Sequence, residues 1–207
     1  MYQPPQFKSD DPAIAAELMR RHAFASLIST DDGGFPFVTH LPLHLEEREG
    51  AFVLWGHCAK PNPHWRYLRE RPQALATFLG PHAYLSPRVY PDRQRVPTWN
   101  YLAVHCKVQA TLVEEPLAKD RLLKRLIGDH EPPFAEQWRS LGEEFAHKML
   151  SGIVGFELRV LEWSCKLKIN QHRPEAHAAM LEGYRAGGSD NERELAGWMQ
   201  RLGMEGR

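Results

Sequence analysis

The sequence predicts a β-barrel with inserted and appended helices rather than a parallel α/β sheet. Short runs of apolar and β-branched residues follow one another with tight-turn residues between them, as is typical of antiparallel strands. Helical patterns follow groups of strands and do not alternate regularly with them. A chain of 207 residues can hold one domain with an appendage. We therefore predict a barrel domain at residues 1–173 and a C-terminal helical appendage at residues 174–207.

The first half of the chain predicts a helix and then a meander of strands. Asp11 and Pro12 supply an N-cap and a first helical position. The DDGG segment at 31–34 can take the positive φ angles of a tight turn, and Gly50 and Gly56 are expected to bound the third strand. The expected elements are a helix from 12 to about 22, strands at 24–30, 37–41 and 51–55, a short helix between Asn62 and Pro72, and a strand at 73–79.

The second half contains the most regular strand. From 102 to 113, apolar residues alternate with polar ones, so that Cys106 faces inward and His105 faces solvent. Ser189 and Glu192 predict a capping box for a final helix. The other expected elements are helices at 116–127 and about 134–150, a strand at 153–163, a helix from Pro174, and a glycine hinge at 187–188.

Charge and composition exclude several classes of protein. The 26 Lys and Arg residues equal the 26 Asp and Glu residues, whereas a free-standing DNA-binding domain usually carries a basic excess. The start of the chain lacks a signal-peptide pattern, and no stretch approaches the roughly 20 apolar residues that span a bilayer. We expect a cytoplasmic protein without a membrane partner. The cysteines Cys58, Cys106 and Cys165 lie too far apart for a CxxC zinc site and are expected to be reduced and structural.

Three segments contain candidate binding residues. In GHCAKPNPHW, Lys60 and the first amides of the following helix could converge on an anion; otherwise Asn62 only caps that helix and Lys60 is solvated. In VPTWNY, an aromatic plane beside hydroxyl and amide donors suits a flat heteroaromatic ligand; otherwise Trp99 anchors a rigid loop in the core. The basic run at 166–173 follows the last expected strand, and it either holds a phosphate or carboxylate or is a solvated loop.

Metal sites and the common catalytic motifs find little support. Two histidine pairs could be nominated as metal ligands, His40 with His44 and His57 with His64. The first pair would share a face of an extended segment, but spacing alone supplies no third ligand, so we expect no metal. His105 and Cys106 lie on opposite faces of their strand, which separates a nucleophile from its base. The sequence contains no GxSxG, GxGxxG or Walker-type phosphate-loop motif. Hydrolase, Rossmann and Walker-type NTPase functions therefore lose their usual support.

Seven segments together resemble the PaiB family of flavin-binding split barrels, in order and in spacing, across about residues 1–180. These segments are MYQPP, THLP, GHCAKPNPHW, FLGPHAYLSPRVY, VPTWNYLAVH, MLSGIVGFEL and KLKINQHRP. The resemblance implies an α+β protein with an antiparallel split β-barrel of the FMN-binding type. It also implies a homodimer that binds FMN in grooves between its protomers, and a role as a negative transcriptional regulator linked to sporulation and protease genes.

The resemblance also implies a set of cofactor-binding residues. Two residues would lie on a flavin-facing strand, three near the phosphate and ribityl chain, three on a segment that closes over the ligand, and two in the terminal basic motif, from the same or the other protomer. In that order they are Thr39 and His40; His57, Lys60 and Asn62; Thr98, Trp99 and Asn100; and Lys168 and Gln171. The family commonly reads KLSQN where this chain reads KINQH, so Asn170 takes the serine place and His172 the asparagine place.

The residues leave three activities open and assign no catalytic residue. An FMN-binding regulator would use different flavin states to bias a dimer between two states. An FMN-dependent oxidoreductase acting on a small molecule would take its chemistry from the cofactor, with His40, His57 or Tyr101 as a proton donor. A haem-binding split barrel would need an axial ligand such as histidine. Direct DNA contact by a regulator would draw on a group of arginines that otherwise form a solvated surface: Arg66, Arg69, Arg71, Arg88, Arg93 and Arg95.

Overall fold

The computed structural model describes residues 1–92 and 94–205. Within these residues, eight strands form one sheet in the order β3-β2-β6-β7-β8-β5-β4, and β1 pairs with β8. The strands are β1 Lys8–Ser9, β2 Phe24–Thr30, β3 Pro36–Pro42, β4 His44–Arg48, β5 Ala51–Ala59, β6 Gln73–Leu85, β7 Thr98–Val113 and β8 Ile153–Lys168. The helices are α1 Pro12–Arg21, α2 His64–Glu70, α3 Pro116–His130, α4 Phe134–Ser140, α5 Glu143–Ser151, α6 His177–Ala186 and α7 Asp190–Arg201. The antiparallel pairing and the added helices confirm the predicted α+β class.

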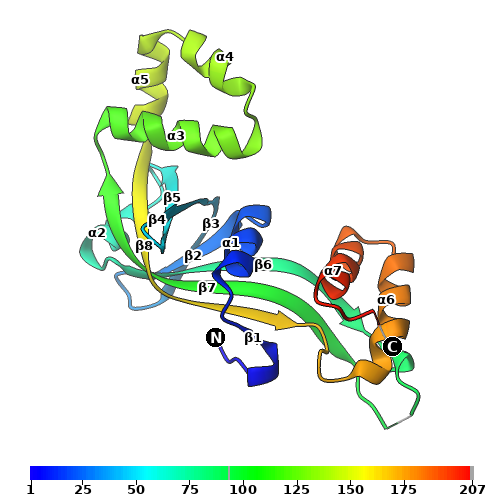
Figure 1. Cartoon of the computed structure of the whole chain (residues 1–207). Coiled ribbons are helices and arrows are strands. Elements are labelled where there is room, and N and C mark those ends of the chain that lie inside the picture. Colours follow the sequence, from blue (N-terminus) through cyan, green and yellow to red (C-terminus); the bar gives the residue numbers. More distant parts are fainter. Residues whose placement is uncertain (93, 206–207) are drawn as a thin grey trace. The chain divides into compact units, whose positions relative to one another are not determined.

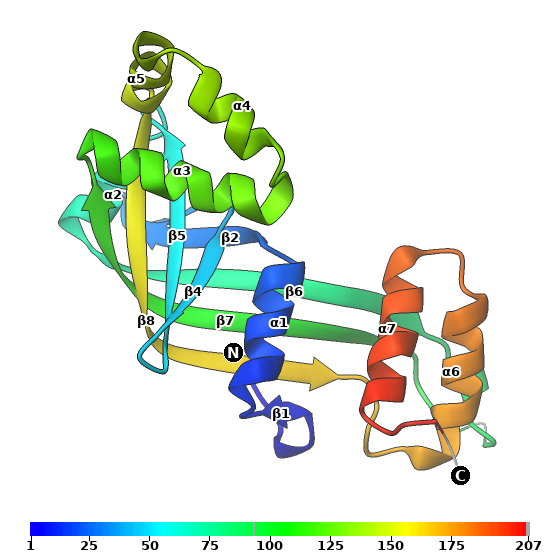
Figure 2. The ribbon, with the colours of Figure 1, turned by 45° about the horizontal axis from the view of Figure 1, so that its top comes forward.

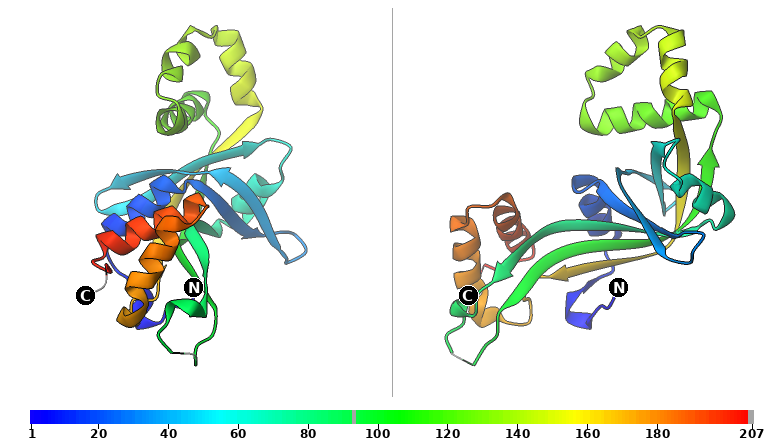
Figure 3. Two further views of the ribbon diagram at one scale, coloured as in Figure 1. Left: turned by 90° about the vertical axis from the view of Figure 1, so that its right-hand side faces the viewer. Right: turned by 180° about the vertical axis from the view of Figure 1, so that it is seen from behind.

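The chain divides into two compact units, which we describe separately. Unit 1 comprises residues 1–18, 79–104 and 164–207, and unit 2 comprises residues 19–78 and 105–163. The long strands β6, β7 and β8 contribute residues to both units, and Figure 3 shows them running side by side. The domain boundary at residue 173 stays a prediction. No helix in the described part of the chain is long and apolar enough to cross a bilayer.

Unit 2 contains the β2–β3 and β4–β5 hairpins. β2 and β3 pair over their whole length, and the Asp31 carboxylate closes their turn by accepting the backbone N–H groups of Gly33 and Phe35 at 2.8 and 2.9 Å. Gly34 takes the predicted positive φ of 83°. β5 pairs with β4 on one side and with β8 on the other (Figure 2). The core beneath these strands includes Leu27, Leu54, Phe78, Phe156 and Leu158.

Helices α3, α4 and α5 connect β7 to β8 within unit 2 (Figure 1). Glu115 caps α3 by accepting the backbone N–H groups of Leu117 and Ala118 at 3.0 and 2.7 Å. The single helix expected at about 134–150 is wrong, because the chain leaves the helical conformation at Leu141 and starts again with Gly142 as N-cap. Gly142 weakens a continuous helix at this point, since glycine loses more backbone entropy there than other residues.

Several strand boundaries differ from the expected ones. The sequence pattern did not predict β4 because its segment, HLEER, is short and mostly charged. β4 is the last strand in the order of the sheet, and charged side chains are common on such edge strands. β7 begins at Thr98 rather than at 102, and β8 continues to Lys168 rather than ending at 163. Thr98–Tyr101 and Lys166–Lys168 therefore lie in strands and not in loops. The predicted alternation around Cys106 is confirmed, since Cys106 is fully buried.

Gly56 lies inside β5, so the expectation that it bounds the strand is wrong. A Cβ atom at this position would lie 2.6 Å from Leu43 and 2.9 Å from Phe156, because side chains from both neighbours pass over the glycine. Gly56→Ala is expected to lower the free energy of unfolding by roughly 1–2 kcal/mol, as the ends of these side chains must move. Urea unfolding measures this change. Gly128→Ala, in α3 with open space around the glycine, is the control and is expected to be neutral or stabilising.

Unit 1 holds the N-terminal segment together with the C-terminal helices α6 and α7, which pack side by side (Figure 1). The predicted capping box is confirmed, because Ser189 Oγ accepts the Glu192 N–H at 3.2 Å and the Glu192 carboxylate accepts the Ser189 N–H at 3.1 Å. Arg201 of α7 forms two 2.5 Å hydrogen bonds with Glu17 of α1. β1 pairs with the end of β8, which buries Lys166.

Candidate functional site

In unit 2, Thr39 on β3 is the centre of a polar cluster. Its hydroxyl oxygen accepts the Asn62 amide at 3.1 Å and lies 2.7 Å from Nδ1 of His64, the first residue of α2. The Asn62 carboxamide oxygen accepts the backbone N–H of His64 at 3.0 Å, so Asn62 connects the first residue of α2 to β3. Thr39 and Asn62 were predicted, and the structure brings them together.

His64 was not among the predicted site residues. Its side chain is 1% exposed, and burial lowers its pKa to about 4, so the imidazole is neutral at pH 7. No described residue lies within hydrogen-bonding distance of its Nε2. In the sequence, His64 follows Asn62 and Pro63 at the start of a helix, and nothing in this triplet distinguishes it from an ordinary helix residue.

The other predicted residues of unit 2 lie in three different surroundings. His57 on β5 has a buried Nδ1 atom with no hydrogen-bond partner among the described residues, and burial lowers its pKa. His40 is exposed and lies 3.0 Å from the Ser26 hydroxyl through Nδ1. Lys60 is exposed, and its backbone N–H donates to the Gly152 carbonyl at 2.8 Å.

In unit 1, Lys168 connects the ends of two strands. Its ammonium group on β8 donates to the Thr98 hydroxyl at 2.6 Å and to the Trp99 carbonyl at 2.5 Å, both on β7. Burial lowers the pKa of Lys168, and the positive charge of Lys166 lowers it further. The structure thus brings Lys168 together with two neighbouring residues that lie 70 and 69 positions earlier in the sequence. A solvated loop, the alternative for this basic run, is wrong for Lys166 and Lys168.

Trp99 is not a core anchor, because its side chain is 49% exposed. Its ring stacks at 6.2 Å on His82 and meets Tyr84 at 6.4 Å, both on β6. Tyr84 is itself 53% exposed. The three rings form an aromatic surface on unit 1, of the kind on which a flat ligand can stack.

Asn100 faces the opposite way from Trp99 on the same strand and is fully buried. Its amide donates to the Tyr184 hydroxyl of α6 at 2.9 Å, while its carboxamide oxygen has no partner among the described residues. Burial raises the pKa of Tyr184 to about 12. Asn100 therefore attaches β7 to α6, a role that the sequence did not suggest.

Gln171 follows β8 in a tight turn, and both ends of its side chain bond within that turn. Its carboxamide oxygen accepts the Ile169 N–H at 3.1 Å, and its amide donates to the Leu167 carbonyl. Asn170, before it, has a left-handed φ of 67°. These contacts give the turn that carries Lys168 a defined shape.

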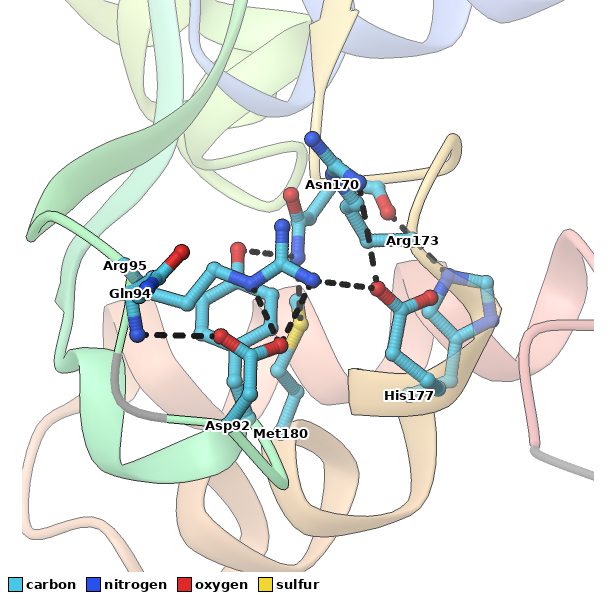
Figure 4. Close-up of polar contacts among 9 residues, drawn as sticks. Asp92, Gln94, Arg95, Asn170, Arg173, His177 and Met180 are labelled. Carbon is cyan, nitrogen blue, oxygen red and sulfur yellow. Dashed lines mark hydrogen bonds and ion pairs between the residues drawn. The ribbon is translucent and has the colours of Figure 1, made fainter.

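A polar network around Asn170 connects this turn to the loop before β7 and to α6 (Figure 4). The Asn170 amide donates to the Tyr90 hydroxyl at 3.0 Å and contacts Met180 Sδ at 3.3 Å, and its carbonyl lies 3.1 Å from His177 Nε2. Arg95 bonds to Asp92 and Glu175, and Figure 4 shows Arg95 and Asp92 near the same turn. Asn170 is one of the two positions, with His172, where the sequence departs from the family pattern.

Asn170→Ala is expected to lower the free energy of unfolding by roughly 2 kcal/mol, and Asn170→Gly by about 1 kcal/mol. Both variants lose the bond to Tyr90, but alanine must also take the left-handed conformation, which costs about 1–2 kcal/mol, whereas glycine takes it readily. Urea unfolding of the two variants measures both losses, and their difference gives the cost of the left-handed conformation for alanine. Equal losses would mean that the positive φ contributes no strain.

Each unit by itself supplies features that suit part of a ligand with polar edges, a flat ring and an anionic end. His57 in unit 2 and Asn100 in unit 1 each carry a buried polar atom that lacks a partner among the described residues. In unit 1, Lys168 supplies a cation that bonds to the backbone carbonyl of Trp99, and the ring of Trp99 is half exposed. FMN has all three of these properties, so the residues present fit it.

Comparisons with known proteins agree with this geometry. Residues 1–162 match the family described as "Putative FMN-binding domain". The chain is 30% identical over 204 residues to "Protease synthase and sporulation protein PAI 2" of Bacillus subtilis (strain 168), across 97% of each chain. The flavocytochrome Anf3 from Azotobacter vinelandii superposes with a TM-score of 0.63 at 19% identity, over 79% of this chain and 70% of that one. The FAD and heme binding protein from Mycobacterium smegmatis superposes with a TM-score of 0.59 at 19% identity, over 78% and 73%.

The two structural likenesses concern the fold alone, and they confirm the predicted split β-barrel. The family match covers more than half of the chain, and the Bacillus relative covers nearly all of it. FMN, the predicted cofactor, is confirmed by the same match. The chain therefore belongs to the PaiB-like family of FMN-binding proteins.

Proposed function

We propose that this protein is an FMN-binding homodimer that acts as a negative regulator of transcription. The observation that carries the binding site is the partly buried Lys168 ammonium in unit 1, which bonds to the backbone carbonyl of Trp99, a residue whose ring is half exposed. We propose that these two residues and the other predicted ones hold the flavin: Thr39, His40, His57, Lys60 and Asn62 from unit 2, and Thr98, Asn100 and Gln171 from unit 1.

The protein's own residues bind and orient the cofactor in this proposal. Thr39 and Asn62 hold the start of α2 against β3, which fixes the side chains around it. Lys168 neutralises an anionic group, and Trp99 offers a stacking surface. When bound, FMN supplies one- and two-electron chemistry. A change in the redox state of the flavin can shift the dimer between two conformations only as far as the flavin's affinities for these two conformations differ.

The regulatory role is supported by the near full-length similarity to the Bacillus protein named for protease synthesis and sporulation. The arginines offered for DNA contact are largely engaged in other interactions. Arg69 pairs with Glu114 at 2.6 Å, Arg71 with Asp32 at 2.7 Å and Arg95 with Asp92 at 2.8 Å, while Arg66 lies over the Trp65 ring. Arg93 lies outside the described residues. These contacts favour an effect on transcription that does not depend on a broad basic surface.

The test starts with protein purified, mixed with FMN and desalted. Retained flavin absorbance and a mass of twice 23.8 kDa by light scattering are expected. Loss of the flavin band after desalting would reject FMN binding, and a monomeric mass would reject the dimer. Target transcripts are then compared in cells with and without the protein, and the holoprotein is assayed for steady oxidation of NADH or NADPH. Turnover without any effect on transcripts would reject the regulator in favour of an FMN-dependent oxidoreductase.

A further inference from the structure

Unit 2 carries a pocket of about 270 Å³ where α3, α5 and the start of β8 meet. Of the residues proposed for flavin binding, only Lys60 lines it. The lining residues are Lys60, Glu114, Pro116, Lys119, His147, Leu150, Ser151, Ile153 and Val154. One part of this wall is apolar and the other carries cationic and hydroxyl groups, so the pocket suits a ligand with both kinds of surface.

Lys119 is the most informative residue of this pocket, because it is only 9% exposed. Its ammonium group donates to the carbonyls of Leu150 at 2.6 Å and Ile153 at 3.4 Å. These two bonds use two of its three N–H donors. Both partners of this ammonium group among the described residues are carbonyl oxygens, which accept hydrogen bonds but carry no negative charge. Burial of a positive charge without an anionic partner is costly.

Lys60 and His147 add two further basic groups to the same wall. The backbone of Lys60 is held beside the α5–β8 connection by its bond to Gly152, which places it at the pocket. Glu114 is the acidic residue of the lining, and its carboxylate already pairs with Arg69 at 2.6 Å. The charge facing the pocket is therefore predominantly positive.

A purely structural role explains only part of this arrangement. The carbonyls that Lys119 contacts lie at the end of α5 and just beyond it, where a cation stabilises unpaired carbonyls and the negative end of the helix dipole. That role needs one lysine. It does not account for Lys60 and His147, which come from different elements and line the same hollow.

We propose that this pocket binds a small anionic molecule, with a phosphate or carboxylate at Lys119, Lys60 and His147 and a short apolar part against Leu150 and Val154. The volume lies just below the roughly 300 Å³ at which pockets for drug-sized ligands begin, so the pocket suits an occupant smaller than such ligands. The ligand would stabilise α3 and α5 against β8. Lys60 is shared with the proposed flavin site, whereas Lys119 and His147 are not flavin-binding residues in our proposal, so the test varies Lys119 and His147.

The test measures binding of inorganic phosphate and of butyrate to the FMN-loaded protein by calorimetry, at constant ionic strength set with chloride. Saturable binding of at least one probe is expected. Lys119→Met is expected to weaken it at least tenfold, and His147→Gln about threefold. Lys148→Gln is the matched control, because Lys148 is exposed on the same helix but does not line the pocket; its affinity is expected to equal that of the wild type.

Three results would overturn the proposal. The first is absence of saturable binding of either probe to the wild type. The second is an equal loss in Lys148→Gln and His147→Gln, which would indicate a general charge effect. The third is displacement of FMN by phosphate, which would make the pocket part of the flavin site. Since Lys119→Met removes a buried group, its unfolding is checked first, and the exposed His147 keeps the test valid if that variant does not fold.

Discussion

Between pH 7.5 and pH 5, the wild-type protein is expected to lose about 2 kcal/mol of unfolding free energy that the His64→Asn variant retains. Burial lowers the pKa of His64 from 6.5 to about 4 in the folded protein. Between these two values the unfolded chain binds a proton at His64 and the folded chain does not. Protons therefore favour the unfolded state, and stability falls as the pH drops below 6.5 and levels off near 4.

Asparagine is the suitable replacement because its carboxamide lies near the position of the imidazole Nδ1, which is 2.7 Å from the Thr39 hydroxyl. The variant keeps a polar partner for Thr39 but has no group that titrates in this range. Burial also lowers the pKa of His57, which is present in both proteins and so cancels in the comparison.

Urea unfolding at pH 7.5, 6 and 5 measures the difference in slope. His130→Asn, at an exposed position at the end of α3, is the control and is expected to follow the wild type. Parallel curves for wild type and His64→Asn would show that His64 is not a buried neutral group in the folded protein.

Local sequence signals predicted the local structure correctly. The β2–β3 hairpin follows from Asp31 and the glycines after it, because a carboxylate that accepts nearby N–H groups and a residue with positive φ are sufficient for the turn. The capping box at Ser189 is equally local. The alternation around Cys106 predicted a strand with one buried face, which is the observed arrangement.

The features that sequence reasoning missed depend on contacts between distant residues. The KLK segment reads as a basic loop, yet Lys166 and Lys168 lie in β8, where the N-terminal segment covers Lys166 and β7 supplies partners for Lys168. His64 reads as an ordinary helix residue until Thr39, 25 positions earlier, is placed beside it. The site residues carried over from the family stay a prediction, and the hydrogen bonds that these residues make could not be read from their spacing.

Lys168→Met is expected to weaken FMN binding about thirtyfold. The ammonium group is partly desolvated, since burial lowers its pKa, and a charge-assisted bond to an anion in such a place contributes about 2 kcal/mol. Methionine keeps the length of the side chain and removes its charge and donors. Fluorescence titration of apoprotein with FMN measures the dissociation constant.

The controls separate the charge at Lys168 from its role in holding the strand ends. Thr98→Val removes one partner of the ammonium at 2.6 Å and leaves the charge, so a smaller loss of about threefold is expected. Lys8→Met removes an exposed charge on β1 of the same unit and is expected to leave FMN affinity unchanged. If Thr98→Val, which keeps the charge, loses as much affinity as Lys168→Met, and Lys168→Arg does not restore the affinity, the strand contact matters more than the charge. Wild-type affinity in a folded Lys168→Met protein would instead exclude Lys168 from the flavin site, and the aromatic surface at Trp99 would then need another cationic partner.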